Sequence, residues 1–171
     1  MKARALFLAV FALVTLTTVV YSQDKPKRPG DISVSEFDTF KNSSFDIVDA
    51  SHNLKNNVTT IDNEIKNYSG VINTIAPDKL KKDLAALKGS KKEAETLADR
   101  IGKLGDQGKE LVGKAKDVTP KMKSLDATSV TNKSIKGLDT AKGYIGDVTK
   151  LLDTNVKLIT DELKKRNEPI E

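Results

Sequence analysis

The residue types that most often carry catalysis or bind metals are scarce in this chain. It contains a single histidine, His52, and no cysteine. A zinc or haem site needs several such ligands close together, so we interpret His52 as a surface residue and expect neither a metal nor another cofactor. Without cysteine there is no disulfide framework, and stability must come from packing.

Pairs of acidic residues are the next candidates, because two carboxyl groups can act as general acid and general base. Asp46 and Asp49 form one such pair, and Asp161 and Glu162 form another. Catalysis would require a concave, desolvated setting that separates the two pKa values of a pair. The helical pattern described below predicts a thin molecule with solvated faces. The sequence therefore favours a protein that is not an enzyme.

Two stretches are candidates for ligand binding. The glycines of IGKLGDQGKELVGK, residues 101–114, do not form a phosphate loop, since no strand is predicted before them and no Gly-Lys-Ser/Thr follows. A cluster of lysines could instead bind an anionic surface such as a membrane or a nucleic acid. No aromatic side chain is interleaved with these lysines, and the export predicted below argues against nucleic acid. We interpret them as a solvated basic face, with peripheral membrane contact less favoured: Lys79, Lys81, Lys82, Lys88, Lys91 and Lys92.

Four Asn-x-Ser/Thr tripeptides are candidate glycosylation sites if the protein is made by a eukaryote. In a bacterial protein the same tripeptides would have no such role, so their use depends on the source. They begin at Asn42, Asn57, Asn67 and Asn132.

The first 22 residues predict export. Two basic residues near the start precede an uncharged run from Ala5 to Val20, and VYS (residues 20–22) follows. This order is typical of a secretory signal peptide, with cleavage expected after Ser22. An uncleaved membrane anchor is the alternative, but a run of sixteen residues is short for a membrane span of about 20. We therefore expect a periplasmic or extracellular protein.

Residues 23–33 predict a flexible basic linker, because they contain prolines and few apolar side chains. A helix is expected over 34–75, with Ser33 and Glu36 forming a capping box at its start. Along this helix apolar residues recur at alternating steps of three and four, as in the seam of a coiled coil. The seam residues are Phe37, Phe40, Ile47, Leu54, Val58, Ile61, Ile65, Tyr68, Ile72 and Ile75.

Two further helices are expected over 77–118 and 120–166, each beginning at a proline, which suits the first turn of a helix. The second has a lighter seam, and its glycine-rich part, 102–113, is expected to be the least rigid. The pattern of the third leaves open a break near 127–131, which would give four helices. Residues 167–171 are expected to form a tail.

Three helices of similar length with short connections predict an all-α fold, an elongated antiparallel up-down-up three-helix bundle with coiled-coil-like packing. Charge suggests how the helices pair. Residues 36–75 carry six acidic side chains and three lysines, whereas 78–123 carry thirteen basic and eight acidic side chains. We therefore expect the first two helices to attract each other, although each exposed pair contributes under about 1 kcal/mol.

An exported bundle without catalytic residues favours a structural or interaction protein. It would serve as a spacer, adaptor or assembly subunit that binds a protein partner through a helix face. A holdase-type helical chaperone is an alternative. An amphipathic lipid-surface binder is less favoured, because such helices have a wider apolar face than this seam. The sequence leaves open self-association and whether the seam closes within one chain or between chains.

Overall fold

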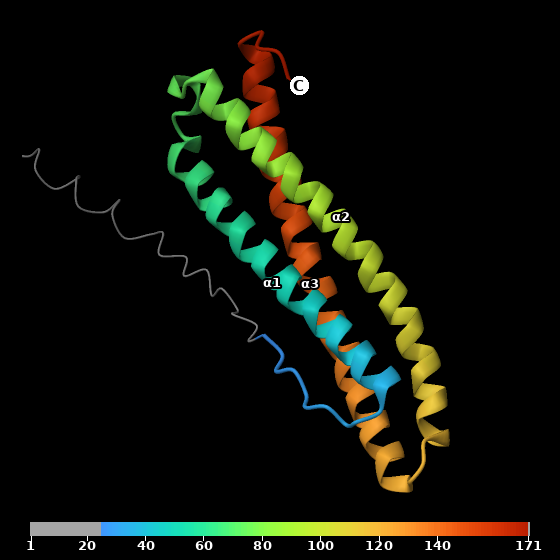
Figure 1. The fold of residues 1–171 in the computed structure, drawn as a ribbon. Coiled ribbons are helices and arrows are strands. Elements are labelled where there is room, and N and C mark those ends of the chain that lie inside the picture. The colour runs from blue at the N-terminus through green and yellow to red at the C-terminus, as the bar shows by residue number, and fades with distance from the viewer. Residues whose placement is uncertain (1–24, 171) are drawn as a thin grey trace, which may run out of the picture.

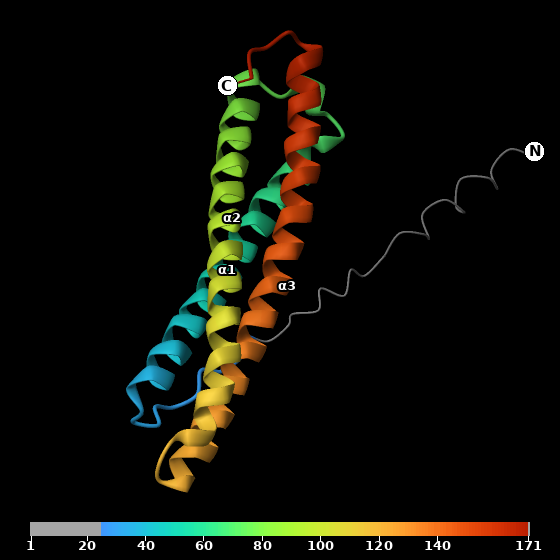
Figure 2. The same cartoon turned by 90° about the vertical axis from the view of Figure 1, so that its right-hand side faces the viewer.

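The computed structural model describes residues 25–170, and this part of the chain is all-helical, with no strand. The predicted signal peptide, residues 1–22, lies outside the described residues. Three long helices pack against one another: α1 (Ser35–Ser69), α2 (Pro77–Lys114) and α3 (Lys121–Lys165). Figures 1 and 2 show them lying side by side in an elongated molecule, with the α1–α2 and α2–α3 connections at opposite ends.

The helix boundaries differ from the sequence prediction at the connections. The first helix ends at Ser69 rather than at 75, and a short 3₁₀ turn, η1 (Ile72–Thr74), follows. Gly70 lies just after α1, and glycine is a poor helix former. The second helix ends at Lys114 rather than at 118, and a second turn, η2 (Ala115–Asp117), follows.

The third helix is continuous, so the break considered near 127–131 does not occur. Two threonines in this stretch return their hydroxyls to the helix. Thr128 Oγ1 donates to the Ser124 carbonyl oxygen at 2.9 Å, and Thr131 Oγ1 donates to the Ala127 carbonyl oxygen at 2.7 Å. The hydroxyl groups of both threonines are therefore satisfied within a regular helix.

The start of α1 is capped differently from the predicted capping box. Ser33 lies in the left-handed region with φ of 58°, and Val34 is the N-cap residue without a side-chain cap. Asp38 replaces the box, because its carboxylate accepts the N–H groups of Ile32 (2.9 Å) and Val34 (3.2 Å). Glu36 instead pairs with Lys114 on α2 at 2.6 Å.

The core follows the seam of α1. Ile61, Ile72 and Ile75 are half-buried and pack against it. The remaining seam residues are fully buried: Phe37, Phe40, Ile47, Leu54, Val58, Ile65 and Tyr68.

A buried polar pair joins α1 to α3. Asn155 Nδ2 donates to Asp62 Oδ1 at 2.9 Å, and both side chains are buried. Lys66 neutralises the other carboxylate oxygen of Asp62 at 2.6 Å. An acidic residue is thus accommodated inside the seam because each of its oxygens has a partner.

The sequence suggested that ion pairs would mainly join α1 to α2, but several of them involve α3 instead. Glu36–Lys114 joins those two helices, but Lys91 pairs with Asp153 of α3 at 3.0 Å. Lys55 of α1 pairs with Asp147 of α3 at 2.8 Å. The third helix therefore supplies acidic partners to both of the others.

Ser51 gives a test of packing along the seam. It is fully buried, and its Oγ has no hydrogen-bond partner among the described residues. Replacing it with alanine should stabilise the protein by about 1 kcal/mol, because the variant no longer buries an unsatisfied hydroxyl. Ser44 is an equally buried control whose Oγ donates to the Phe40 carbonyl oxygen at 2.8 Å. Urea unfolding should show Ser51→Ala raising the midpoint and Ser44→Ala leaving it unchanged or lowering it; equal shifts would contradict the assignment.

Candidate functional site: a groove and an N-terminal strap

A groove of about 540 Å³ lies between α2 and α3, over the glycine-rich part of α2. Ile101, Leu138 and Ile145 contribute apolar side chains to its lining. Gly102 and Gly105 line it as well, and a Cβ atom added at either position would meet no atom within 4 Å. The groove exists because these two residues have no side chain to fill it.

The next glycine along α2 has the opposite environment. A Cβ atom at Gly108 would lie 2.8 Å from Phe40 Cζ and 2.9 Å from Ile135 Cγ1. Here α2 approaches its neighbours so closely that only glycine fits. One glycine therefore brings the helices together, while the two before it leave the groove open.

Both rims of the groove carry charges of both signs. Asp106 and Lys109 lie on the α2 rim, and Asp139 and Lys142 lie on the α3 rim. Lys109 Nζ is 2.9 Å from Asp106 Oδ1, and this hydrogen bond raises the pKa of the lysine. An apolar lining between mixed-charge rims suits an amphipathic peptide better than a strongly charged ligand.

The second surface is made by residues 25–34, which we call the strap. Arg28 Nη2 donates to Asp46 Oδ1 at 2.7 Å and to Asp49 Oδ2 at 3.2 Å, and the bond to Asp46 raises the pKa of the guanidinium. Lys25 also pairs with Asp49, at 2.9 Å. The acidic pair considered above for acid–base chemistry thus anchors the strap to α1. The mobility predicted for this segment stays a prediction.

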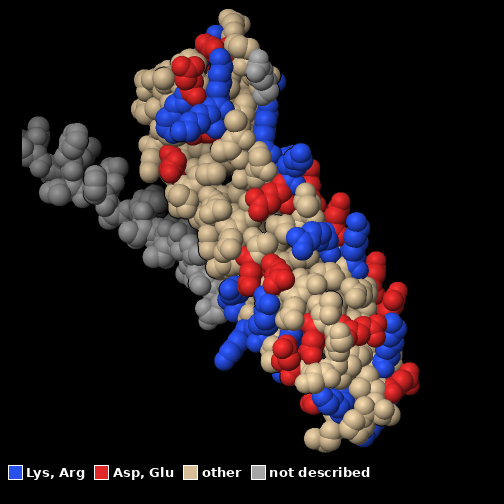
Figure 3. Space-filling view, viewed as in Figure 1, with Lys and Arg blue, Asp and Glu red and all other residues tan. Residues whose placement is uncertain are grey.

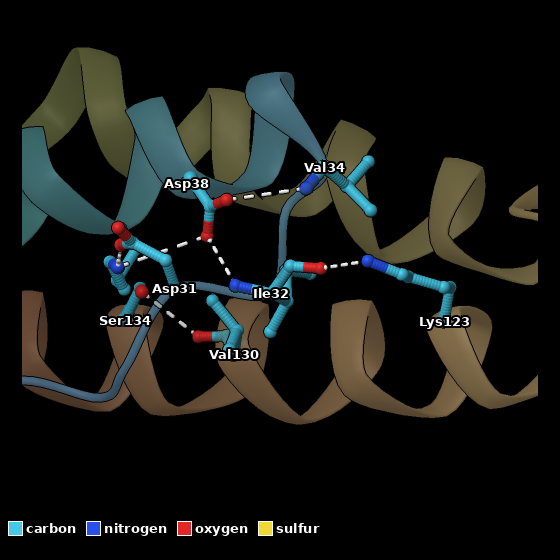
Figure 4. Close-up of polar contacts among 8 residues, drawn as sticks. Asp31, Ile32, Val34, Asp38, Lys123, Val130 and Ser134 are labelled. Atoms are coloured by element: carbon cyan, nitrogen blue, oxygen red, sulfur yellow. Dashed lines mark hydrogen bonds and ion pairs between the residues drawn. The ribbon is translucent and has the colours of Figure 1, made fainter.

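The middle of the strap meets a buried lysine. Lys41 of α1 has a side chain that is 1% exposed, and its ammonium pairs with Asp31 of the strap and lies 3.8 Å from Asp38. Lys123 of α3 donates to the Ile32 carbonyl oxygen at 2.5 Å. Figure 4 shows the strap running between α1 and α3 at this point. Lys41 and Lys123 carry no local sequence signal for this role, because their strap partners Asp31 and Ile32 lie 10 and 91 residues away.

The candidate basic face is only partly free of internal partners. Lys79 pairs with Asp83 at 2.9 Å, and Lys81 pairs with Glu168 at 2.7 Å. Lys91 pairs with Asp153, as described above. Lys81 is half-buried, and the other five lysines are exposed. Figure 3 shows basic and acidic side chains interspersed along the edge formed by α2. This edge therefore does not form a purely basic patch.

His52 is half-buried rather than fully solvated. Its ring packs edge-on against Tyr144 of α3, with centroids 5.5 Å apart, and Lys55 Nζ lies 5.1 Å from the centre of the same tyrosine ring. Within residues 25–170 no three metal-ligating side chains come together. The second acidic pair is separated, since Asp161 is exposed whereas Glu162 is buried and bonded to Arg166 at 2.8 Å.

The four candidate glycosylation residues all lie inside helices. Asn42, Asn57 and Asn67 belong to α1, and Asn132 belongs to α3. Asn42 is half-buried, and the other three are exposed. Their modification stays a prediction.

Tyr68 gives a test of stability against pH. Burial, reinforced by a 2.7 Å hydrogen bond from its hydroxyl to Asp83, raises its pKa above the usual 10.0. The folded state therefore favours the neutral phenol, so this contribution to stability is full below the unfolded pKa and is lost as pH rises above it. We expect the wild-type protein to lose more stability between about pH 9 and about pH 11 than Tyr68→Phe. Thermal unfolding at both pH values tests this, and identical pH dependence in both proteins would contradict it.

No helix in the described part of the chain is both long and apolar enough to cross a membrane. Comparisons of this sequence and structure with protein-family models, with curated proteins and with solved structures found no match.

Proposed function

We propose that this chain is an exported, non-enzymatic interaction protein that binds a helical segment of a partner protein in the groove between α2 and α3. The export rests on the predicted signal peptide. As an adaptor or assembly subunit, the protein would need a rigid body that presents the groove. The apolar groove between charged rims is the observation that carries this proposal.

For that rigid body we propose an antiparallel up-down-up bundle with coiled-coil-like packing. Two ion pairs support this arrangement. Glu36–Lys114 joins the start of α1 to the end of α2, and Lys81–Glu168 joins the start of α2 to the segment after α3. Contacts between α1 and α3 keep a nearly constant sequence offset, 92 residues for Lys55–Asp147 and 93 for Asp62–Asn155, which supports helices running in the same direction.

The chemistry of the groove favours a helix as the occupant. Peptide grooves that bind amphipathic helices combine an apolar floor with polar flanks. Gly102 and Gly105 expose backbone without side chains, so the backbone of a partner helix can approach closely there. The mixed charges on both rims favour a partner helix with an apolar stripe flanked by both lysine and acidic residues.

Crosslinking followed by binding measurements tests this proposal. A photoreactive amino acid placed at Lys109, on the rim, should capture a protein in the producing cell that the same probe at Gly143 of α3 does not. Absence of such a difference would overturn the proposal. The captured protein would then be purified, and its affinity for the wild-type protein and for Gly105→Leu, whose new side chain fills the groove, would be measured by calorimetry.

Gly143→Leu provides the matched control. A Cβ atom at Gly105 or at Gly143 meets no atom within 4 Å, and both residues lie inside helices. Each variant gains similar helix propensity, so both should fold. We expect Gly105→Leu to weaken binding at least about tenfold, which corresponds to about 1.4 kcal/mol, and Gly143→Leu to leave it unchanged. Equal affinities would contradict groove binding.

A holdase-type chaperone is a second candidate, favoured by two exposed apolar side chains at the start of α3. Met122 is 71% exposed and Leu125 is 57% exposed. Residues three apart share a face of a helix, and exposed methionines suit promiscuous apolar contacts. Under this alternative the protein would suppress aggregation of a denatured client at stoichiometric ratios, and Met122→Ser with Leu125→Ser would abolish the effect. Light scattering measures both.

A further inference from the structure

We propose that residues 25–32 of the strap are exchangeable, so that this segment of one copy docks on α1 and α3 of a second copy and forms a strap-swapped dimer. This partner differs from the one proposed for the groove, and the two surfaces are lined by different residues.

The lysine beneath the strap favours an occupant that carries a carboxylate. Lys41 has a side chain that is 1% exposed, and its ammonium pairs with Asp31 of the strap, whose own side chain is 71% exposed. Asp38 of α1 lies 3.8 Å from the same ammonium. A docked segment that supplies a carboxylate at this position therefore gives Lys41 a closer charged partner than Asp38 does.

The rest of the site recognises an extended backbone. Asp38 accepts the N–H groups of Ile32 and Val34, and Lys123 donates to the Ile32 carbonyl oxygen. Figure 4 shows Ile32 lying between Asp38 of α1 and Val130 of α3. Ile32 also packs against the apolar core. Main-chain hydrogen bonds combined with apolar side-chain contacts are the usual means of binding an extended peptide.

A second ionic anchor extends the pattern toward the N-terminus. Arg28 binds Asp46 and Asp49, while Lys25 binds Asp49. The complete pattern is a basic residue, a carboxylate three residues later and an apolar residue directly after it. Val34 lies beyond the hinge and stays with its own α1, whose first N–H groups bond to its carbonyl oxygen. The strap of a second copy carries every one of these groups in the right order, which makes it the occupant that fits best.

The connection between the strap and α1 provides the hinge. Ser33 has φ of 58°, a conformation that non-glycine residues seldom adopt, and α1 begins two residues later at Ser35. Pro26 and Pro29 stiffen the segment. A stiff docked segment joined by a short strained hinge is an arrangement that favours exchange between identical chains. The same contacts form in both states, so concentration and hinge strain should set their balance.

Engineered cysteines test the exchange directly, because the chain has none of its own. Arg28→Cys and Asp46→Cys would be made in separate chains, mixed and oxidised gently. We expect disulfide-linked heterodimers whose yield rises with total concentration and exceeds that of a control mixture by at least about tenfold. The control combines Arg28→Cys with Asp153→Cys; the side chains of Asp46 and Asp153 are 63% and 58% exposed. Equal yields would overturn the proposal.

Hinge variants provide a second, independent measurement. Proline cannot adopt the φ of Ser33, and Asp38 accepts N–H groups from residues 32 and 34 rather than from 33. Ser33→Pro should therefore extend the hinge and increase the dimer fraction measured by light scattering after gel filtration. Ser33→Gly should relieve the strain and decrease it. Identical dimer fractions would overturn the proposal, whereas loss of dimer in Gly105→Leu would assign self-association to the groove instead.

Discussion

Replacing Gly108 with valine is expected to lower the free energy of unfolding by about 3 kcal/mol, at the upper end of the usual cost of overpacking. The first atom of any side chain would lie 2.8 Å from Phe40 Cζ and 2.9 Å from Ile135 Cγ1. Phe40 is fully buried, so its ring cannot move aside without disturbing the core. The better helix propensity of valine offsets only a fraction of this cost.

Gly89→Val is the control for this substitution. Gly89 also lies within α2, but a Cβ atom there meets nothing within 4 Å. Valine at this position should raise the unfolding free energy by a few tenths of a kcal/mol, about the difference in helix propensity. Urea unfolding of both variants compares them directly. If Gly108→Val were as stable as Gly89→Val, α2 could not approach Phe40 as closely as described.

Replacing Arg166 with methionine should destabilise the protein by about 2–4 kcal/mol. Its guanidinium donates to Glu162 Oε1 at 2.8 Å, to the Ile75 carbonyl oxygen at 2.5 Å and to the Ile72 carbonyl oxygen. Glu162 is only 7% exposed. The variant would leave this carboxylate with the more distant Lys165, 3.8 Å away. It would also remove the arginine donors from two carbonyl groups of the α1–α2 connection, of which Ile72 keeps the N–H group of Ile75.

Two controls separate the role of Arg166 from the loss of a positive charge. Arg100 is exposed on α2, so Arg100→Met should change the unfolding free energy by less than about 0.5 kcal/mol. Arg166→Lys should recover only part of the stability, because lysine cannot reproduce the planar fork of donors. Equal urea midpoints for Arg166→Met and Arg100→Met would show that the connection does not depend on this side chain.

Apolar spacing was sufficient to locate three long helices, because burial of one face imposes a period that is readable in the sequence. The ends were less predictable. Where α1 stops depends on Gly70 and on Arg166, which binds carbonyl groups of the connection from more than 90 residues away. Such a contact leaves no local signal in the sequence near residue 75.

The seam itself departs from a strict heptad at one point. Ser51, Leu54, Val58 and Asp62 are buried in turn. Eleven residues thus span three turns, closer to the natural period of an α-helix than seven residues over two turns. A strict heptad would place Ile61 rather than Asp62 at the buried position. Asp62 is the more buried of the two, because Asn155 gives its carboxylate a buried hydrogen-bond partner.

The strap and the groove could not be identified from the sequence for physical reasons. Residues 25–34 have the composition of a linker, and Arg28 finds Asp46 only after α1 has formed. Gly102, Gly105 and Gly108 are identical as residue types, yet two leave space and one is packed against two side chains. Only the packing of the neighbouring helices distinguishes these roles.

The Asp62–Asn155 pair helps to exclude some non-native arrangements of the helices. If α1 slid along α3 by one heptad, Asp62 would face Val148 or Glu162, both of which are buried on α3. Neither side chain can donate an N–H group to the carboxylate, and Glu162 would add a second acidic group to the interface. Apolar residues elsewhere in the seam tolerate exchange with one another, so they discriminate poorly between such slipped states. We infer that this single polar pair disfavours the slipped alignments and so contributes to the uniqueness of the fold.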